Sequence, residues 1–307
     1  MGQNIGELGE FGLIRAVTRG LPQGPAVELG PGDDAAVVGV PDGRVVATSD
    51  LLVQDRHFRL DWSTGWDVGR KAAAQNLADV VAMGARPTAL LVGFGGPPET
   101  PVEWVEALYA GLREECDLVG ASIVGGDVVR SPTITIAVTA LGDLAGAAPL
   151  LRSGARPGDV VAVCGRLGFS AAGFELLAAG LDGPLADAHR RPRPPYAAGP
   201  EAVRLGATSL LDVSDGLVQD LRHIAAASGV RIELSTGLLP TAPGVTLEHV
   251  LTGGEDHAFA GTFPSAQGLP ERWRVIGSVA EGEGLTVDGS AFGGGGWDHF
   301  APTHFAP

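Results

Sequence analysis

The stretch GDLAGAAPLLRSGARPGDVVAVCG, residues 142–165, decides how this chain is divided. Its first part, residues 142–159, is rich in small residues, glycine and proline and shows no helical or strand-like periodicity. The run VVAVCG at residues 160–165 is typical of a buried strand. Domain boundaries usually fall in such connections, because few contacts cross them. We therefore predict an N-terminal domain over residues 1–145 and a C-terminal domain over residues 146–307.

Apolar periodicity and turn residues predict both helices and strands in the N-terminal half. Residues 65–83 carry apolar side chains at helical spacing, and Asn76 and Asp79 lie one turn apart on a shared face. The predicted elements of this half are, in order, a helix over residues 6–18, strands within 26–52, the helix over 65–83, a strand over 89–94, a helix over 102–118, a strand over 122–124 that ends in a GGD turn at 125–127, and a strand over 133–141.

The C-terminal half shows the same mixture. The motif DVSDG at residues 212–216 is expected to open a helix, with Ser214 or Asp215 as its N-cap. The predicted elements are strands over residues 160–165, 230–234, 258–263 and 273–276 and helices over 170–179 and 217–227. Because strict alternation of strand and helix is absent, we predict an α+β fold with predominantly antiparallel or mixed sheets.

Composition excludes several classes of partner. The chain of 307 residues has 45% hydrophobic residues, enough for substantial cores, and a formal charge of −15. Nucleic acids and anionic membranes need a basic face, so neither is expected as a partner.

Cys116 and Cys164 form no CxxC pair, and no apolar run reaches the ~18 residues of a membrane span. We predict a cytoplasmic protein.

Short acidic motifs beside glycine or hydroxyl residues recur along the chain. They are GDDAAVV (32–38), TSD (48–50), NLADVVAMGA (76–85), GGD (125–127), DVSDG (212–216) and GGED (253–256). A protein that binds phosphates usually carries clusters of lysine and arginine, but this chain has a single lysine, Lys71. The motifs GxxxxGK[ST], HExxH and GxSxG are all absent. We infer that metal ions supply the positive charge.

The carboxylates of these motifs predict a magnesium site. Two carboxylates ~4 Å apart repel by roughly 4 kcal/mol at an effective dielectric constant near 20, so a cluster needs cations or protons. Mg²⁺ prefers oxygen ligands and links one or two carboxylates to substrate phosphates. One such motif alone is commonly a turn or a helix cap, so the prediction rests on their joint occurrence. The expected chemistry is phosphoryl transfer from magnesium nucleotide. The set is Asp34, Asp50, Asp79, Asp127, Asp212 and Asp215.

As an ordered set, these motifs resemble the thiamine-monophosphate kinase family. LLRSGARPGD, DVSDGLVQDLRHIA, LTGGEDHAF and the terminal WDHF complete the resemblance, which spans nearly the whole chain. It implies a homodimer in which two N-terminal sheets pair, with a C-terminal α/β domain that completes the active-site cleft. It also implies transfer of the γ-phosphate of ATP directly to thiamine monophosphate, with several Mg²⁺ ions, to give thiamine diphosphate.

The resemblance also assigns roles to individual residues. Those that match metal positions are Asp34, Thr48, Ser49, Asp50, Asp79, Asp127, Asp212 and Asp215, of which Asp50, Asp127 and Asp215 are the expected catalytic residues. Those that match nucleotide contacts are Tyr109, Gly126, Asp127, Arg152 and Ser214. Those that match the thiamine phosphate side are His57, Glu255 and Trp297, whereas His257 and His299 are expected only to orient backbone or fill space.

The chain departs from the family pattern at SDLLVQDRHF, residues 49–58, where Asp55 and Arg56 replace a site that often holds a small residue. Two alternative functions remain open at this stage. One is a different ATP-using synthetase of the same superfamily, such as selenophosphate synthetase or aminoimidazole ribonucleotide synthetase. The other is a non-catalytic regulator that binds nucleotide or metal.

Overall fold

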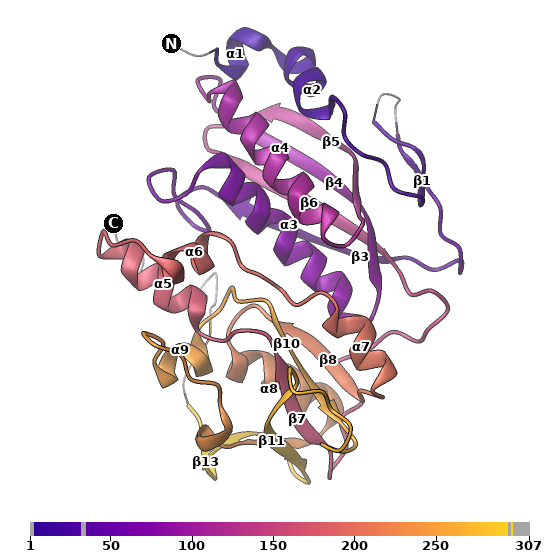
Figure 1. Ribbon diagram of the computed structural model, residues 1–307, viewed down its shortest axis with the longest axis vertical. Helices are drawn as coiled ribbons and strands as arrows, with labels where there is room; N and C mark the ends of the chain where they lie inside the picture. Colours follow the sequence, from indigo (N-terminus) through magenta and orange to yellow (C-terminus); the bar gives the residue numbers. More distant parts are fainter. Residues whose placement is uncertain (1–2, 32–34, 294–295, 297–307) are drawn as a thin grey trace. The chain divides into compact units, whose positions relative to one another are not determined.

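The computed structural model describes residues 3–31, 35–293 and 296 (Figure 1). The chain forms two compact units, Met1–Pro149 and Leu150–Pro307, which we call unit 1 and unit 2. The division falls inside the small-residue segment 142–159. Each unit has its own sheets and helices and is described separately.

Unit 1 is built on a mixed sheet with the strand order β3-β6-β4-β5 in the described part of the chain. β4 and β5 are parallel, and the other pairs are antiparallel. A separate antiparallel pair, β1 and β2, lies nearer the N-terminus. The strands are β1 (Val27–Leu29), β2 (Val37–Val38), β3 (Val46–Val53), β4 (Arg86–Gly96), β5 (Ser122–Arg130) and β6 (Thr135–Asp143).

Helices α3 (Gly65–Ala82) and α4 (Val102–Asp117) cover one face of this sheet (Figure 1). Thr64 caps α3 through a capping box with Asp67, and Gly84 follows its end at φ +75°. Both helices were predicted and are confirmed. On the opposite face of the sheet, apolar side chains remain exposed: Leu51 is 55%, Leu91 39% and Val129 53% exposed.

Two N-terminal-half predictions were wrong in detail. The helix predicted over residues 6–18 is split into α1 (Ile5–Leu8) and α2 (Glu10–Thr18), because Gly9 adopts φ +73°. The GGD motif is not a turn, since β5 runs straight through it. A Cβ atom on Gly126 would lie 1.8 Å from the carbonyl oxygen of Val92, so glycine here permits close pairing of β5 with β4.

Unit 2 contains a larger mixed sheet with the order β13-β12-β9-β11-β7-β10-β8. β12 and β9 are parallel, and the other pairs are antiparallel. The two mixed sheets confirm the predicted α+β class. The strands are β7 (Val160–Cys164), β8 (Ser209–Val213), β9 (Arg231–Leu234), β10 (Ala258–Phe263), β11 (Arg274–Ala280), β12 (Gly284–Val287) and β13 (Ser290–Ala291).

The main core of unit 2 lies between this sheet and helix α8 (Leu217–Ser228). Leu217, Leu221 and Ile224 pack with sheet residues such as Val163 and Val213. The other helices are α5 (Phe169–Ala178), α6 (Pro184–Arg190), α7 (Ala198–Arg204) and α9 (Leu247–Thr252), with a 3₁₀ turn, η1 (Thr236–Leu238). Among the helices of unit 2, the sequence predicted α5 and α8 but not α6, α7 or α9.

The predicted N-cap of α8 was wrong. Gly216, and not Ser214 or Asp215, occupies the N-cap position. Instead, the Asp220 carboxylate accepts hydrogen bonds from the backbone N–H groups of Asp215 and Gly216, each at 3.0 Å. A carboxylate inside the first turn therefore satisfies N–H groups at the helix start.

Both cysteines are free thiols buried in the core, Cys116 in unit 1 and Cys164 in unit 2. Burial raises the pKa of each thiol, that of Cys164 to about 11, so neither is a reactive thiolate. Across the described residues, no helix combines the length and the apolar character required to cross a membrane.

Candidate functional site

The TSD motif places its side chains on both faces of the unit 1 sheet, because side chains alternate along a strand. The Thr48 hydroxyl donates a hydrogen bond of 2.7 Å to Asp79 Oδ2 on α3. Thr48 therefore faces the helices, and two residues of the predicted metal set lie in contact. Ser49 points to the opposite face, where its hydroxyl donates to the Val138 carbonyl and accepts from Thr139 Oγ1.

Asp50 lies on the helix-covered face with Thr48. Its backbone N–H donates to Asn76 Oδ1 at 3.1 Å, and Asn76 Nδ2 donates to the Ala72 carbonyl at 2.9 Å. Asn76 is fully buried, so its amide fixes the strand relative to α3. The prediction that Asn76 and Asp79 share a face is confirmed, since each bonds a residue of the TSD motif.

Gly126 and Asp127 lie at the far edge of the same sheet, on β5. In the strand register, Asp50 pairs with Val138, Val138 with Val92, and Val92 with Gly126. Gly126 therefore lies in the same cross-strand row as Asp50. Asp127 falls in the next row, which contains Leu51, and so lies on the face that carries Ser49. Its carboxylate accepts a hydrogen bond from the N–H of Val128 at 2.9 Å. Of the predicted acidic set, Asp50 and Asp127 thus lie on opposite faces of the sheet.

His57 lies in a tight turn after β3. Its Nδ1 accepts a hydrogen bond of 2.9 Å from the N–H of Val53, and its carbonyl accepts one of 2.9 Å from Lys71 Nζ. Lys71 is only 2% exposed, so the single lysine of the chain holds this turn from inside unit 1. Asp55 adopts φ +61° here. That backbone favours glycine and is tolerated by aspartate, which explains how Asp55 can replace a small residue.

Two predicted nucleotide contacts differ in accessibility. Tyr109 on α4 is 7% exposed, and burial raises the pKa of its phenol, so it remains a neutral side chain inside the helical layer of unit 1. Arg152 is exposed in the segment that precedes β7 in unit 2. Its carbonyl accepts a hydrogen bond from the Ser228 hydroxyl at 3.0 Å, which fixes the backbone and leaves the guanidinium on the surface.

In unit 2, the DVSDG and GGED motifs lie against each other. The Glu255 N–H donates to the Ser214 carbonyl at 2.7 Å, and the His257 N–H donates to the Val213 carbonyl at 2.9 Å. His257 Nδ1 also lies 3.0 Å from Asp212 Oδ2. A Cβ atom at Gly254 would lie 2.4 Å from the Ser214 carbonyl oxygen, so only glycine allows this approach. The structure therefore brings Asp212, Ser214 and Glu255 together.

Asp220 is a carboxylate that the sequence analysis missed. Burial, followed by the charges of Asp215 and Asp212, raises its pKa to about 7. Asp220 therefore lies near enough to Asp215 and Asp212 for their charges to act on it. The signal was present as the third aspartate of DVSDGLVQD, which falls inside the helix predicted over residues 217–227.

The segment Glu255–Asp256–His257 sends three side chains to three different elements. His257 reaches Asp212, as described above. The Asp256 carboxylate accepts hydrogen bonds from the N–H of Gly168 and, at 2.8 Å, from that of Ser170, at the start of α5. Burial nevertheless raises the pKa of Asp256 to about 7. Glu255 Oε2 lies 3.5 Å from Nδ1 of His189 on α6. The sequence predicted roles for Glu255 but not for Asp256 or His189.

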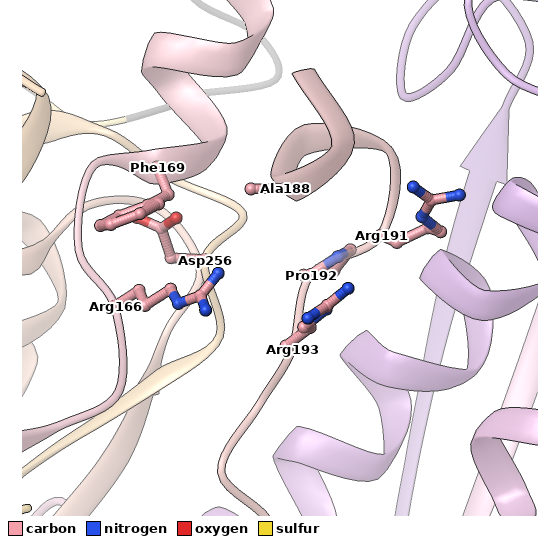
Figure 2. Close-up of a pocket in the computed structure, with 7 residues that line it drawn as sticks. All are labelled: Arg166, Phe169, Ala188, Arg191, Pro192, Arg193 and Asp256. Atoms are coloured by element: carbon pink, nitrogen blue, oxygen red, sulfur yellow. The ribbon is translucent and has the colours of Figure 1, made fainter. Parts of the chain in front are cut away.

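A pocket next to this segment is lined by arginines. Its lining residues are Arg166, Phe169, Ala188, Arg191, Pro192, Arg193 and Asp256, as Figure 2 shows. The Arg166 guanidinium lies 5.2 Å from the centre of the Phe169 ring, and Arg191 pairs with Asp187 at 2.5 Å. Three arginines thus line one pocket of a strongly acidic chain.

The oxygen donors described here suit a hard cation. Mg²⁺ needs only one or two carboxylates, because waters and phosphate oxygens complete its shell. Among the residues that the structure describes, no three His, Cys, Asp or Glu side chains form a ready metal cluster. Two predicted site residues, Asp34 and Trp297, lie outside the described residues, as does His299.

Comparisons with known proteins give the family. A family profile described as AIR synthase related protein, N-terminal domain, matches residues 32–144. The thiamine-monophosphate kinase of Mycobacterium tuberculosis is 51% identical, over 96% of this chain and 92% of that protein. The structure of AaThiL complexed with AMPPCP and TMP matches with a TM-score of 0.80 at 34% identity, over 96% of this chain and 98% of that chain. Hydrogenase maturation protein HypE, with a TM-score of 0.73 at 20% identity over 90% of this chain and 94% of that chain, shows the fold alone. On this similarity over nearly its whole length, the chain belongs to the thiamine-monophosphate kinase family.

Proposed function

We propose that this protein transfers the γ-phosphate of ATP to the phosphate of thiamine monophosphate and so makes thiamine diphosphate. The observation that carries the proposal is the similarity, over nearly the whole chain, to AaThiL complexed with AMPPCP and TMP. AMPPCP is an ATP analogue, so that structure holds counterparts of both substrates. The proposal also explains why an acidic chain with one lysine retains carboxylates in glycine-rich loops.

The proposed reaction needs little covalent chemistry from the protein. The attacking group is a phosphate oxygen, which is already anionic, so no activated serine or cysteine is required. Catalysis then depends on positioning and on neutralising the phosphate oxygens. Mg²⁺, when bound, supplies that neutralisation. The fixed Thr48–Asp79 contact and the Asn76–Asp50 bond orient oxygen donors in unit 1, and the paired 212–216 and 253–257 loops do so in unit 2.

The individual site roles are part of this proposal. Mg²⁺ is bound by Asp34, Thr48, Ser49, Asp50, Asp79, Asp127, Asp212 and Asp215. ATP is bound by Tyr109, Gly126, Asp127, Arg152 and Ser214. Thiamine monophosphate is bound by His57, Glu255 and Trp297. The support for His57 and Glu255 is their fixed geometry, because Lys71 anchors the first and the DVSDG loop anchors the second. The burial of Tyr109 limits its contact surface in a single chain.

The proposal includes a homodimer formed through the open face of the unit 1 sheet. Leu51, Leu91 and Val129 are exposed there, on strands β3, β4 and β5. Large apolar residues exposed on an uncovered sheet face favour a protein interface there. A cytoplasmic location also remains part of the proposal.

A product assay tests the activity. The intact protein is incubated with γ-labelled ATP and Mg²⁺, together with thiamine monophosphate, thiamine or aminoimidazole precursors in separate reactions. We expect labelled thiamine diphosphate only from thiamine monophosphate, and none after chelation of Mg²⁺. Tight ATP binding without transfer would favour a non-catalytic regulator, and ATP consumption only with another acceptor would favour a different synthetase.

A further inference from the structure

Arg152, a proposed nucleotide contact of unit 2, lies in irregular backbone. Residues 151–159, all of which the structure describes, form neither helix nor strand before β7 begins at Val160. The N–H and C=O groups of such a segment have no regular ladder, so other groups must bond them. The groups that do so determine where the backbone of Arg152 lies.

One hydroxyl forms three of these hydrogen bonds. Ser228 Oγ accepts from the N–H of Gly154 at 3.1 Å and from the N–H of Ala155 at 3.2 Å, and it donates to the Arg152 carbonyl at 3.0 Å. A serine hydroxyl has one hydrogen to donate and two lone pairs to accept with, so these three bonds use its full capacity. Ser228 therefore closes the turn over residues 152–155.

Ser228 is attached to a rigid part of unit 2. It is the last residue of α8, and Gly229 ends that helix at φ +65°. Leu221, Ile224 and Ala225 of the same helix belong to the buried core. A binding group on a loop is placed accurately when rigid elements support the loop. The hydroxyl thus connects the turn over residues 152–155 to the core of unit 2.

Other contacts hold the two sides of this turn. Before it, the Leu151 carbonyl accepts a hydrogen bond from the N–H of Leu210 at 3.2 Å. After it, the Asp159 carboxylate accepts one from the N–H of Arg156 at 3.0 Å. Because these bonds do not involve Ser228, loss of its hydroxyl should loosen the turn without unfolding unit 2.

We infer that Ser228 is a positioning residue for the nucleotide, whose hydroxyl holds the turn over residues 152–155 in the conformation from which Arg152 binds the phosphates of ATP. The inference rests on the proposed function, in which Arg152 contacts ATP. A guanidinium binds phosphate through a planar fork, so its contribution depends on direction as well as charge. Without the hydroxyl, Arg152 keeps its charge, but the turn must be ordered when ATP binds, and this cost weakens binding.

Kinetics of single variants test the inference. In Ser228→Ala we expect the KM for ATP to rise by roughly 10-fold, within the loss of up to ~100-fold that a displacement of ~1 Å can cause. The KM for thiamine monophosphate should stay nearly constant, because the contacts proposed for that substrate do not include Arg152. Ser228→Thr keeps a hydroxyl and should restore the wild-type value. Ser153→Ala removes an exposed hydroxyl from the same turn and, as the matched control, should have no effect.

A double-mutant cycle separates positioning from a general loss of structure. If Ser228 acts through Arg152, Ser228→Ala should change the KM for ATP far less in an Arg152→Ala background than in the wild type. Additive effects of the two substitutions, or equal changes in the KM values of both substrates, would overturn the inference. An unchanged KM for ATP in Ser228→Ala would do the same.

Two measurements do not depend on turnover. Hydrogen exchange of the wild-type protein should show protected amides at Gly154 and Ala155, and exchange as fast as in an unstructured peptide would refute the inference even if Ser228→Ala does not fold. Calorimetric titration with Mg-ATP alone gives the Kd for each variant. A wild type that binds Mg-ATP but makes no thiamine diphosphate would refute the proposed function, and the ratio of Kd between Ser228→Ala and the wild type would then decide the inference. A wild type that binds no Mg-ATP would refute both.

Discussion

At the scale of single residues, the site depends on buried side chains that bind no ligand themselves in our assignment. Asn76 holds the Asp50 backbone, Lys71 holds the His57 turn, and Asp220 holds the backbone of Asp215 and Gly216. A buried polar group is costly unless it is bonded, so each of these contacts also supports the local fold. The groups proposed to meet phosphate are therefore presented on fixed backbone.

Replacement of a predicted metal ligand tests the magnesium assignment. Removal of a residue that only orients a metal ligand lowers activity by up to ~100-fold. Asp50 and Asp127 are proposed as ligands themselves, so we expect Asp50→Asn and Asp127→Asn each to lower kcat/KM by at least ~100-fold. Without metal, each variant should be as stable as the wild type or slightly more stable, because like-charge repulsion is relieved. Steady-state kinetics and thermal melts with chelator measure the two effects. The exposed Asp117→Asn is the control, and near-normal turnover in the ligand variants would contradict the assignment.

The buried Asp256 predicts a pH dependence of stability. Its folded-state pKa is raised to about 7 from an ordinary value of 3.8, so the unfolded chain releases the proton first as pH rises. The Asp256 carboxyl therefore makes its full contribution to the free energy of unfolding below pH ~4. Between pH ~4 and about pH 7, the free energy of unfolding falls by up to ~1.4 kcal/mol per pH unit. In Asp256→Asn, urea titrations across this range should show a smaller slope than the wild type, by up to that amount; the slope from Asp220, whose pKa is also raised to about 7, remains. The loss of one accepted N–H bond lowers stability overall. Glu283→Gln, at an exposed site, should retain the wild-type slope.

At the scale of secondary-structure elements, glycine determines how closely α3 and α4 pack. A Cβ at Gly69 would lie 2.0 Å from the Leu108 carbonyl oxygen, and one at Gly111 would lie 2.1 Å from that of Trp66. The helices therefore approach through backbone contacts on both sides. This close pair covers the sheet face that carries Thr48 and Asp50, so helix packing fixes the distance between α3 and the TSD motif.

Substitution of Gly69 by alanine tests this packing. Alanine is intrinsically better than glycine in a helix by ~1 kcal/mol. Overpacking costs roughly 1 to 3 kcal/mol, and because the added Cβ meets backbone, which cannot rotate away, we expect this cost to exceed the gain. The net result should be a lower midpoint of urea denaturation. In Gly12→Ala on α2, the added Cβ meets only the flexible side chain of Leu8, so stability should be unchanged or slightly higher. Equal effects of the two substitutions would show that helix propensity, not close approach, controls the result.

At the scale of the whole molecule, the open sheet face of unit 1 predicts self-association. Leu51→Glu or Leu91→Glu should weaken the dimer at least ~10-fold in Kd, about 1.4 kcal/mol, because a charge would be buried in an apolar interface. Sedimentation equilibrium over a range of protein concentrations measures this. Leu181→Glu removes a leucine of similar exposure, 56%, in unit 2 and is the control. A wild-type protein that stays monomeric at all concentrations would contradict the proposal.

Much of the fold was predictable where apolar periodicity and the turn residues that end an element lie within one short segment. The helices over residues 65–83 and 102–118 and the strand over 258–263 were all found, because apolar spacing and flanking Gly or Pro define them. Errors arose where tertiary pairing overrode a local signal. GGD has the composition of a turn, yet pairing with β4 extends it into a strand. Short helices such as α9 were missed because six residues carry too little periodicity.

The sequence by itself determined the chemistry of this protein. Its ordered acidic motifs, the single lysine and the alignment of the motifs with a known family depend only on residue identity, so they were readable without coordinates. Only the tertiary structure decided which groups hold these motifs in place: Asn76 beside Asp50, Asp220 beside Asp215, and Ser228 beside Arg152. These pairs are 5 to 76 residues apart in the chain, from 215 to 220 and from 152 to 228. Hydrogen bonds depend on distance in space and direction, and neither quantity is encoded in sequence spacing once the chain has turned back on itself.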